Sequence, residues 1–276
     1  MFRTNNAGVN IRLEKIFRGK KNLVISALDH VMEYGYQPGI EDSRIAIKNC
    51  LETDALLLSR FMLQRNWDLF TQRNSPSPVV RINWSSSFYY PLDYREGNTT
   101  IASTVEEAVA AGAEAVICSL FLEEDSEVRQ TNNVNIFSQV VRQKEKLGIP
   151  LIGECYVVEH KDKTDEEVHK KVKRVSRIMA ELGADLIKTF YTGKLFNEVV
   201  ENTTVPVFTI GAEKLKTDYE VLLKAEGSIK KGARGIIFGR NIFMAKKPIE
   251  LIKALNEVIN NGVSCKEAVN KFNLGD

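Results

Sequence analysis

Eight short apolar runs recur along the chain, each followed by a polar loop and then by a segment with helical periodicity. The runs are mostly apolar throughout rather than alternating, which is typical of parallel strands covered on both faces. We expect strands at Leu23–Leu28, Ala55–Ser59, Val79–Asn83, Ala115–Ser119, Pro150–Glu154, Leu186–Phe190, Pro206–Ile210 and Gly235–Gly239. Eight β/α units over roughly 250 residues predict an α/β fold, a (β/α)8 TIM barrel.

Segments with helix-capping signals lie between these strands. Thr104–Ala111 opens with the residue spacing of a capping box. Asp165–Leu182 has acidic residues in its first turn and Gly183 just past its end, both favourable placements. We expect further helices at Thr217–Lys231 and Pro248–Asn260, and an irregular segment at Arg60–Phe70.

Neither a Pro/Gly/Ser-rich linker nor a low-complexity tract divides the chain, so we expect a single domain over residues 1–276. The barrel would carry a short N-terminal extension and a C-terminal helix. The alternative is an open doubly wound sheet, which also alternates strands and helices. The count of eight favours closure, and no GxGxxG motif follows the first expected strand, which weakens a dinucleotide-binding fold.

Composition excludes several classes of function. The 38 Lys+Arg and 36 Asp+Glu residues give a net charge of +2, which argues against a nucleic-acid binder with a basic face. No window approaches the ~20 apolar residues of a membrane span, and the N-terminus lacks an apolar signal core. The 4 Cys form no CxxC motif, as expected for a reducing cytoplasm, and the 3 His share no metal-ligand spacing. If the protein is an enzyme, we expect it to work without a transition metal.

Lys188 is the most informative candidate for catalysis, because it lies within the apolar run 184–190. The active sites of TIM barrels form at the C-terminal ends of the strands. Burial there disfavours the charged form of an amine, and a neutral amine is the nucleophile that a Schiff base requires. The alternative is that Lys188 pairs with an acid or reaches water along its stem. The barrel context favours the nucleophile.

Three other side chains at the strand ends are candidates for proton transfer. Tyr156 follows the neighbouring strand and either shuttles protons or packs over the barrel mouth. Asp29 follows the first strand and either acts as a base, orients a hydroxyl, or caps the next turn. His30 is either an acid–base group or a half-buried histidine that holds the loop, and its role stays open.

The loops after the last two strands are candidates for phosphate binding. In TIM barrels these loops, together with the N-terminus of a short helix, commonly hold a phosphate. Gly211 follows the seventh strand, and Gly239 and Arg240 follow the eighth. Bare amides and a guanidinium both suit an anion. The alternative is a plain tight turn with an exposed arginine.

Five segments carry a resemblance over most of the chain, from about Ile11 to about Leu255. They are ALDH (Ala27–His30), TVEEAVAAGAEAV (Thr104–Val116), GIPLIGECY (Gly148–Tyr156), ELGADLIKTFYTG (Glu181–Gly193) and KGARGIIFGRNIF (Lys231–Phe243). Together they resemble the archaeal-type class I fructose-bisphosphate aldolase family, the DhnA/DeoC-like Schiff-base aldolases. The last two segments are the most specific.

The resemblance implies roles for individual residues. Lys188 matches the imine-forming lysine of the family, Tyr156 its tyrosine, and Asp29 the Asp of its DHG-type loop. The residues that match its phosphate-binding loops are Gly211, Ala212, Lys214, Gly239 and Arg240. Two departures leave the substrate open: Ala212 replaces a paired glycine, and the segment 156–159 reads YVVE where the family has Tyr-Pro-Arg-Gly.

The resemblance also implies a reaction class. The expected activity is aldol cleavage or formation of a C–C bond in a phosphorylated ketose or related keto compound, with no cofactor beyond the imine on Lys188. Other branches of the family are the aminodideoxyheptulosonate synthase and the hydroxypentanedione phosphate thiolase of autoinducer processing. The thiolase transfers an acetyl group to coenzyme A, and there a histidine at the position of His30 takes part. A non-catalytic barrel that binds a sugar phosphate is a further alternative. Homo-oligomers are common in the family, so the resemblance also implies a homo-oligomer.

Overall fold

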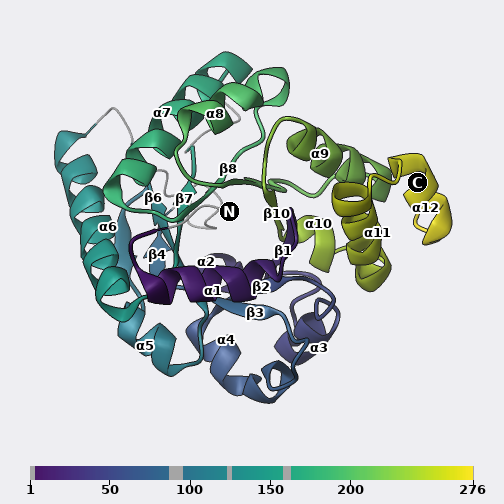
Figure 1. Ribbon diagram of the computed structural model, residues 1–276, viewed down its shortest axis with the longest axis horizontal. Coiled ribbons are helices and arrows are strands. Elements are labelled where there is room, and N and C mark those ends of the chain that lie inside the picture. Colours follow the sequence, from purple (N-terminus) through teal and green to yellow (C-terminus); the bar gives the residue numbers. More distant parts are fainter. Residues whose placement is uncertain (1–3, 87–95, 123–125, 158–162, 276) are drawn as a thin grey trace.

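Eight parallel strands form a closed barrel in the computed structural model, which describes residues 4–86, 96–122, 126–157 and 163–275. The strands are β1 (Leu23–Ala27), β2 (Ala55–Ser59), β3 (Ser77–Arg81), β6 (Ala115–Leu120), β7 (Leu151–Cys155), β8 (Leu186–Thr189), β9 (Val207–Ile210) and β10 (Gly235–Phe238). Their order is β1-β10-β9-β8-β7-β6-β3-β2, and β1 also pairs with β2 (Figure 1). This closure confirms the predicted TIM barrel and excludes the open doubly wound sheet.

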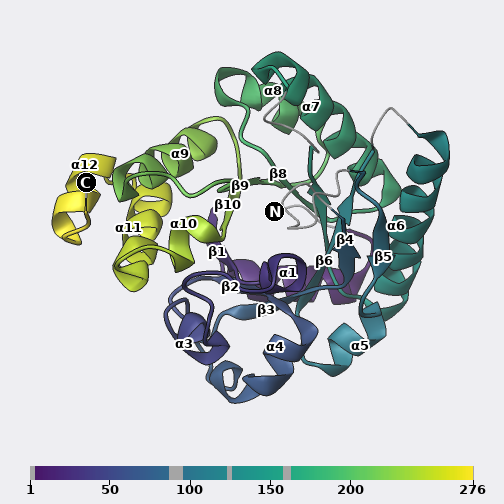
Figure 2. The same cartoon turned by 180° about the vertical axis from the view of Figure 1, so that it is seen from behind.

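Helices surround the strands, as Figures 1 and 2 show from opposite sides. They are α2 (Val31–Tyr34), α3 (Ser43–Lys48), α4 (Arg60–Arg65), α5 (Val105–Ala110), α6 (Glu127–Leu147), α7 (Asp165–Leu182), α8 (Phe196–Asn202), α9 (Asp218–Lys230), α10 (Arg240–Phe243), α11 (Pro248–Asn261) and α12 (Cys265–Lys271), with 3-10 turns η1 (Trp67–Phe70) and η3 (Gly193–Leu195). Within the described ranges, none of the helices combines the length and the apolar composition needed to cross a bilayer.

The predicted capping signals define the helix ends. The Thr104 hydroxyl accepts a hydrogen bond from the Glu107 amide at 3.1 Å, and the Glu107 carboxylate accepts one from the Thr104 amide at 2.9 Å. This reciprocal pair satisfies two donors that the first turn of a helix leaves free. At the other end of α7, Gly183 ends the helix at φ +111, a conformation that side chains with a Cβ disfavour. The segment Arg60–Phe70, expected to be irregular, is instead mostly helical: α4 covers Arg60–Arg65, and the 3-10 turn η1 follows at Trp67–Phe70.

The N-terminal extension forms α1 (Ala7–Phe17), which closes the end of the barrel where the strands begin. Its Arg12 guanidinium donates to the Gly148 carbonyl at 2.8 Å, just before β7. Its buried apolar side chains belong to the same cluster as the side chains that point into the barrel. That cluster comprises Val9, Leu13, Ile16, Phe17, Leu23, Ile25, Ala27, Ala55, Leu57, Val79, Ala115, Ile117, Ile152, Leu186, Phe208 and Ile237. Apolar side chains therefore fill the barrel at the end where its strands begin.

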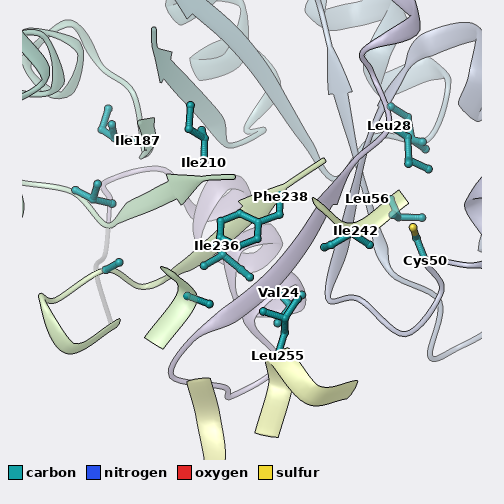
Figure 3. Close-up of a cluster of buried hydrophobic side chains, with 14 of the residues drawn as sticks. Val24, Leu28, Cys50, Leu56, Ile187, Ile210, Ile236, Phe238, Ile242 and Leu255 are labelled. Carbon is teal, nitrogen blue, oxygen red and sulfur yellow. The ribbon is translucent and has the colours of Figure 1, made fainter. Parts of the chain in front are cut away.

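The remaining strand residues, which alternate with the interior ones, face outward and pack against the helices. Figure 3 shows Val24, Leu56 and Ile236 from the strands beside Ile242 of α10 and Leu255 of α11. A fully buried side chain of this size contributes about 1.5–3 kcal/mol relative to an exposed one. Two apolar layers, one on each face of the strands, explain why the strand sequences are apolar rather than alternating.

The third barrel strand ends earlier than the predicted boundary at Asn83, which is therefore wrong by two residues. Asn83 begins β4 (Asn83–Ser85), which pairs antiparallel with β5 (Thr99–Ile101) in a separate sheet. The Asn83 side-chain amide donates to the hydroxyls of Ser85 and Thr99, both at 2.9 Å, and its oxygen accepts from the Ser119 amide. These bonds turn the chain away from the barrel, so Arg81 is the last residue of β3.

Candidate active site

A cavity opens at the carboxyl ends of the barrel strands, with an empty volume of about 640 Å³ including its mouth. Eight of the nine predicted site residues line it: Asp29, His30, Tyr156, Lys188, Gly211, Ala212, Gly239 and Arg240. The ninth, Lys214, lies half-buried in the loop after β9 but does not line the cavity. The structure therefore brings together the predicted catalytic and phosphate-binding residues and leaves Lys214 outside.

The floor of the cavity is a polar layer directly above the apolar interior. Its members are Arg81, Ser119, Glu154 and Lys188, each two positions beyond an interior residue of its strand. Because strand side chains alternate between faces, a spacing of two keeps them pointing inward. Register then aligns three of them, since Ser119 pairs with Glu154 and Glu154 pairs with Lys188 across β6, β7 and β8.

Lys188 and Glu154 form a buried ion pair on this floor. The Lys188 Nζ lies 2.5 Å from Glu154 Oε1, and the two residues are only 6% and 7% exposed. Burial alone would raise the pKa of the Glu154 carboxyl, but the Arg81 and Lys188 cations hold that pKa well below its usual range. The sequence predicted an uncharged amine. The structure instead shows the alternative considered for Lys188, in which the lysine pairs with an acidic residue.

Arg81 joins the two carboxylates of the floor. Its Nε donates to Asp29 Oδ2, its Nη1 to Ser119 Oγ at 2.7 Å and its Nη2 to Glu154 Oε2 at 2.7 Å. Ser119 Oγ also donates to the same Glu154 oxygen. Charge-assisted bonds of this kind fix orientation as well as charge. Glu154 is therefore held by Arg81 and Ser119 on one oxygen, and it presents the other to Lys188.

Asp29 is committed to Arg81 rather than available as a base. Burial would raise the pKa of the Asp29 carboxyl, but the Arg81 and Lys188 cations lower that pKa below its ordinary value. A carboxylate held ionised by a permanent cation is a weak proton acceptor. It remains a good hydrogen-bond acceptor, so of the roles considered from the sequence, orienting a hydroxyl fits its surroundings best.

His30 is packed from three sides and is neutral near pH 7. Its ring lies 5.8 Å from the Tyr34 ring and 5.3 Å from the Phe243 ring. A Cβ added at Gly239 would lie 2.2 Å from His30 Cε1, so the glycine is needed for this approach. Burial lowers the pKa of His30 to about 4. The imidazole thus reaches the cavity without a charge.

This burial of His30 predicts a loss of stability in mild acid. Because the pKa of His30 is about 4 in the folded protein and about 6.5 when unfolded, the unfolded state binds the proton first as pH falls. We expect His30 alone to reduce the free energy of unfolding by about 2 kcal/mol between pH 7 and pH 5. Urea unfolding at both pH values checks this, and His30→Phe, which keeps an aromatic ring, should remove that part of the loss. An unchanged pH dependence in His30→Phe would contradict it.

Tyr156 lies just beyond β7 at the edge of the cavity. Its ring packs against Phe190 with a centroid separation of 5.0 Å and against Phe121 at 6.1 Å. The ring therefore packs over the cavity mouth and the residue lines the cavity, whereas its role in proton transfer stays a prediction. Val158 and Glu159, where the sequence departs from the family pattern, lie outside the described residues.

Side chains of three neighbouring residues donate hydrogen bonds to the carbonyl groups of the loop after β9. The Lys224 Nζ donates to the Gly211 carbonyl at 2.8 Å, and Arg240 Nη2 donates to the Ala212 carbonyl at 2.7 Å. Asn241 Nδ2 donates to the carbonyls of Gly211 and Glu213 at 3.1 and 2.9 Å. Ala212 has φ +56, in the left-handed region. Burial lowers the pKa of Lys224 to about 8.

The cavity residues that the sequence did not single out include Glu33, Arg81, Ser119 and Glu154. Arg81 carried the same signal as Lys188, a cation within an apolar strand, but the expected strand end at Asn83 hid it. Glu154 stood at the end of a predicted strand, and only the register shows that it meets Lys188. Across the ranges that the structure describes, no three His, Cys, Asp or Glu side chains are arranged to hold a metal ion.

Comparison with other sequences identifies relatives along nearly the whole chain. The model of the DeoC/LacD family aldolases matches residues 25–245. An uncharacterized aldolase of Saccharolobus solfataricus is 31% identical over 268 residues, which cover 95% of this chain and 98% of that protein. A 3-hydroxy-5-phosphonooxypentane-2,4-dione thiolase of Enterobacter sp. is 29% identical over 263 residues, which cover 95% of this chain and 84% of the thiolase.

Solved structures share the barrel as well. A Schiff-base-forming fructose-1,6-bisphosphate aldolase matches with a TM-score of 0.77 and 26% identity, covering 90% of this chain and 99% of that one. An archaeal fructose-1,6-bisphosphate aldolase, solved with its catalytic lysine covalently bound to the carbinolamine intermediate, matches with a TM-score of 0.76 and 25% identity, at 90% and 99% coverage. With its closed barrel and a family match over most of its length, the chain belongs to the DeoC/LacD family of aldolases.

Proposed function

We propose that the protein is a class I aldolase that breaks or forms a C–C bond in a phosphorylated ketose or related keto compound through an imine on Lys188. The observation that carries the proposal is the Lys188–Glu154 pair, buried on the floor of a cavity that is also lined by residues of the predicted phosphate loops. The similarity to aldolases that form a Schiff base supports it. The proposal requires no metal or cofactor.

The charges around Lys188 suit an iminium ion. A ketone and a lysine ammonium give an iminium ion, which is a protonated imine, and water. The positive charge therefore stays on the same nitrogen. Glu154 at 2.5 Å, held ionised by Arg81, stabilises that charge both before and after the reaction. The iminium then acts as the electron sink for cleavage of the neighbouring C–C bond.

Glu154 is in position to carry the proton that imine formation moves. Its Oε1 relays one proton from the Lys188 ammonium to the carbonyl oxygen as the nitrogen attacks the carbonyl carbon, so Glu154 stays a carboxylate. A second proton then passes by the same route from nitrogen to the carbinolamine hydroxyl, which leaves as water, and the positive charge stays on nitrogen. Tyr156 at the cavity edge passes protons to and from the substrate, and Asp29 orients a hydroxyl.

A phosphate held by the loops after β9 and β10 would position the ketone over Lys188 of the neighbouring β8. Arg240 supplies a cation there, and the loop at Ala212 supplies backbone amides. Binding energy at such a remote group lowers the entropic cost of bringing the carbonyl to the amine.

Arg240→Ala is therefore expected to raise KM about 10–100-fold for a phosphorylated substrate, because a charge-assisted hydrogen bond contributes about 1.5–3 kcal/mol. We expect kcat to change less, since Arg240 lies away from the reacting atoms. Arg234→Ala is the matched control: Arg234 precedes β10 at the other end of the barrel and donates to the Lys21 carbonyl. Steady-state kinetics of both variants check this, and an unchanged KM in Arg240→Ala would contradict it.

The second candidate is an acyl transfer to coenzyme A, as in the thiolase relative. It is favoured by that relative at 29% identity and by the neutral His30 in the cavity. A direct assay separates the two reactions: the aldolase releases an aldehyde from a ketose phosphate, whereas the thiolase forms acetyl-coenzyme A from a diketone phosphate. Aldehyde release supports the proposal, and acetyl-coenzyme A formation alone supports the second candidate. Phosphate-ester binding with neither product would indicate a non-catalytic barrel.

A further inference from the structure

Among the described residues, three carboxyl groups line the cavity, and Arg81 binds two of them. Asp29 accepts from Arg81, and Glu154 accepts from Arg81, Ser119 and Lys188. The third, Glu33, lies half-buried on α2. Among the described residues, no hydrogen bond or ion pair holds the Glu33 carboxyl group. A carboxyl group in a cavity with no structural partner is available to a ligand.

The short helix that carries Glu33 is fastened in place over the floor of the cavity. The Trp84 indole, on β4, donates to the Met32 carbonyl at 3.1 Å, and the Tyr34 ring stacks on His30. The helix therefore has fixed contacts at the residues on either side of Glu33. A side chain projected from such a clamped turn reaches the substrate with little loss of conformational entropy.

The closed order of the strands places Glu33 across the cavity mouth from Lys188. Lys188 lies on β8, which pairs with β9, and the first of the loops that we assign to the phosphate follows β9; the second follows β10, which pairs with β1 just before α2. His30, after β1, packs against Phe243 and against Gly239. A ketose phosphate held by these two loops therefore lies between Lys188 and Glu33 in the same cavity.

We propose that Glu33 is the general base and acid at the C–C bond itself, an inference that rests on the proposed imine at Lys188. In cleavage, the Glu33 carboxylate accepts the proton of the hydroxyl on the carbon β to the iminium carbon. The O–H electron pair becomes the second bond of the aldehyde carbonyl. The C–C bond breaks, its electron pair forms the enamine double bond, and the iminium π pair moves to nitrogen. In synthesis the Glu33 carboxylic acid returns the proton to the alkoxide.

The surroundings of Glu33 suit this role. Burial raises the pKa of Glu33 to about 7, with Arg81 opposing the rise and Glu154 and Asp29 adding to it. A base whose pKa is near the working pH combines a useful ionised fraction with useful basicity. Asp29 and Glu154, whose pKa values lie below their ordinary range, are poorer acceptors for a hydroxyl proton.

The test separates imine formation from bond cleavage in Glu33→Gln. Dihydroxyacetone phosphate with borohydride measures imine formation, and fructose 1,6-bisphosphate measures cleavage through aldehyde release. We expect Glu33→Gln to cut cleavage about 10²–10⁴-fold while the extent of trapping stays within about twofold of wild type. Glu154→Gln is the contrasting variant and is expected to slow trapping itself. Cleavage by Glu33→Gln at the wild-type rate overturns the proposal, and failure of the wild type to trap overturns the proposed function on which it rests.

A pH profile and a stability measurement together distinguish a catalytic Glu33 from one with a structural role alone. The wild-type kcat/KM for cleavage should rise with an apparent pKa near 7, and Glu33→Gln should lose that limb. Because the folded pKa is raised, stability from Glu33 is complete below pH 4.5 and is lost as pH rises through 7. Glu33→Gln should therefore melt at a higher temperature than wild type at pH 8, with the gap narrowing toward pH 5. A lower melting temperature at pH 8 together with an unchanged pH profile would contradict the assignment.

Discussion

Lys188→Met is expected to lower kcat by about 10⁴-fold or more, because it removes the nitrogen on which the proposed imine forms. Among the described residues, no second lysine lines the cavity to replace it, and the guanidinium of Arg81 does not form an imine. Turnover of a ketose phosphate, followed by aldehyde release, measures the loss.

The control for this variant is Lys188→Arg. Methionine leaves Glu154 with one cation fewer in a buried site, so a loss of activity could follow from a disturbed fold. Arginine keeps a cation beside Glu154 but does not form an imine. We expect Lys188→Arg to retain more of the wild-type stability than Lys188→Met and to lose the same activity. Turnover within tenfold of wild type in either variant would contradict the mechanism.

Arg81→Met is expected to reduce the free energy of unfolding by about 3–5 kcal/mol, the cost of removing one partner from a buried ion pair. Arg81 is 4% exposed and donates to both Asp29 and Glu154. Without it, two buried carboxylates would share the single cation of Lys188. Denaturant unfolding at pH 7, with unchanged m-value as the check on two-state behaviour, measures the effect.

Two further variants show whether the loss comes from charge. Arg81→Lys keeps the cation but lacks the planar fork that reaches both carboxylates, so its stability should lie between those of wild type and Arg81→Met. Adding Asp29→Asn to Arg81→Met removes one of the stranded charges and should recover part of the lost stability. A loss below about 1 kcal/mol in Arg81→Met would show that the floor does not depend on this arginine.

Much of the fold was accessible from sequence because local and global signals agree. The strands are short and apolar on both faces, and the helices begin at capping boxes such as Thr104 with Glu107 and end at glycines such as Gly183. Each signal acts within a few residues, which is the range that sequence patterns cover. The third strand was misjudged because the apolar run continues through Ile82, whereas the side-chain bonds of Asn83 turn the chain out of the barrel.

The site was only partly accessible, for a physical reason. Lys188 stood out because a cation within an apolar strand is rare, and the resemblance added Tyr156 and the loops at Gly211 and Gly239. The ion pair of Lys188 with Glu154 follows from the register of β7 on β8, which the sequence does not display. Glu33 lies on a four-residue helix with no periodicity, so only the packed structure brings it to the cavity.

Borohydride reduction followed by peptide mapping tests the central claim most directly. The wild-type protein is incubated with dihydroxyacetone phosphate, reduced and digested, and the mass of the peptide that contains Lys188 is measured. We predict a single stable adduct on Lys188 that is absent from Lys188→Arg. An adduct on any other lysine, or aldehyde release from a ketose phosphate with no adduct at all, would contradict the imine mechanism.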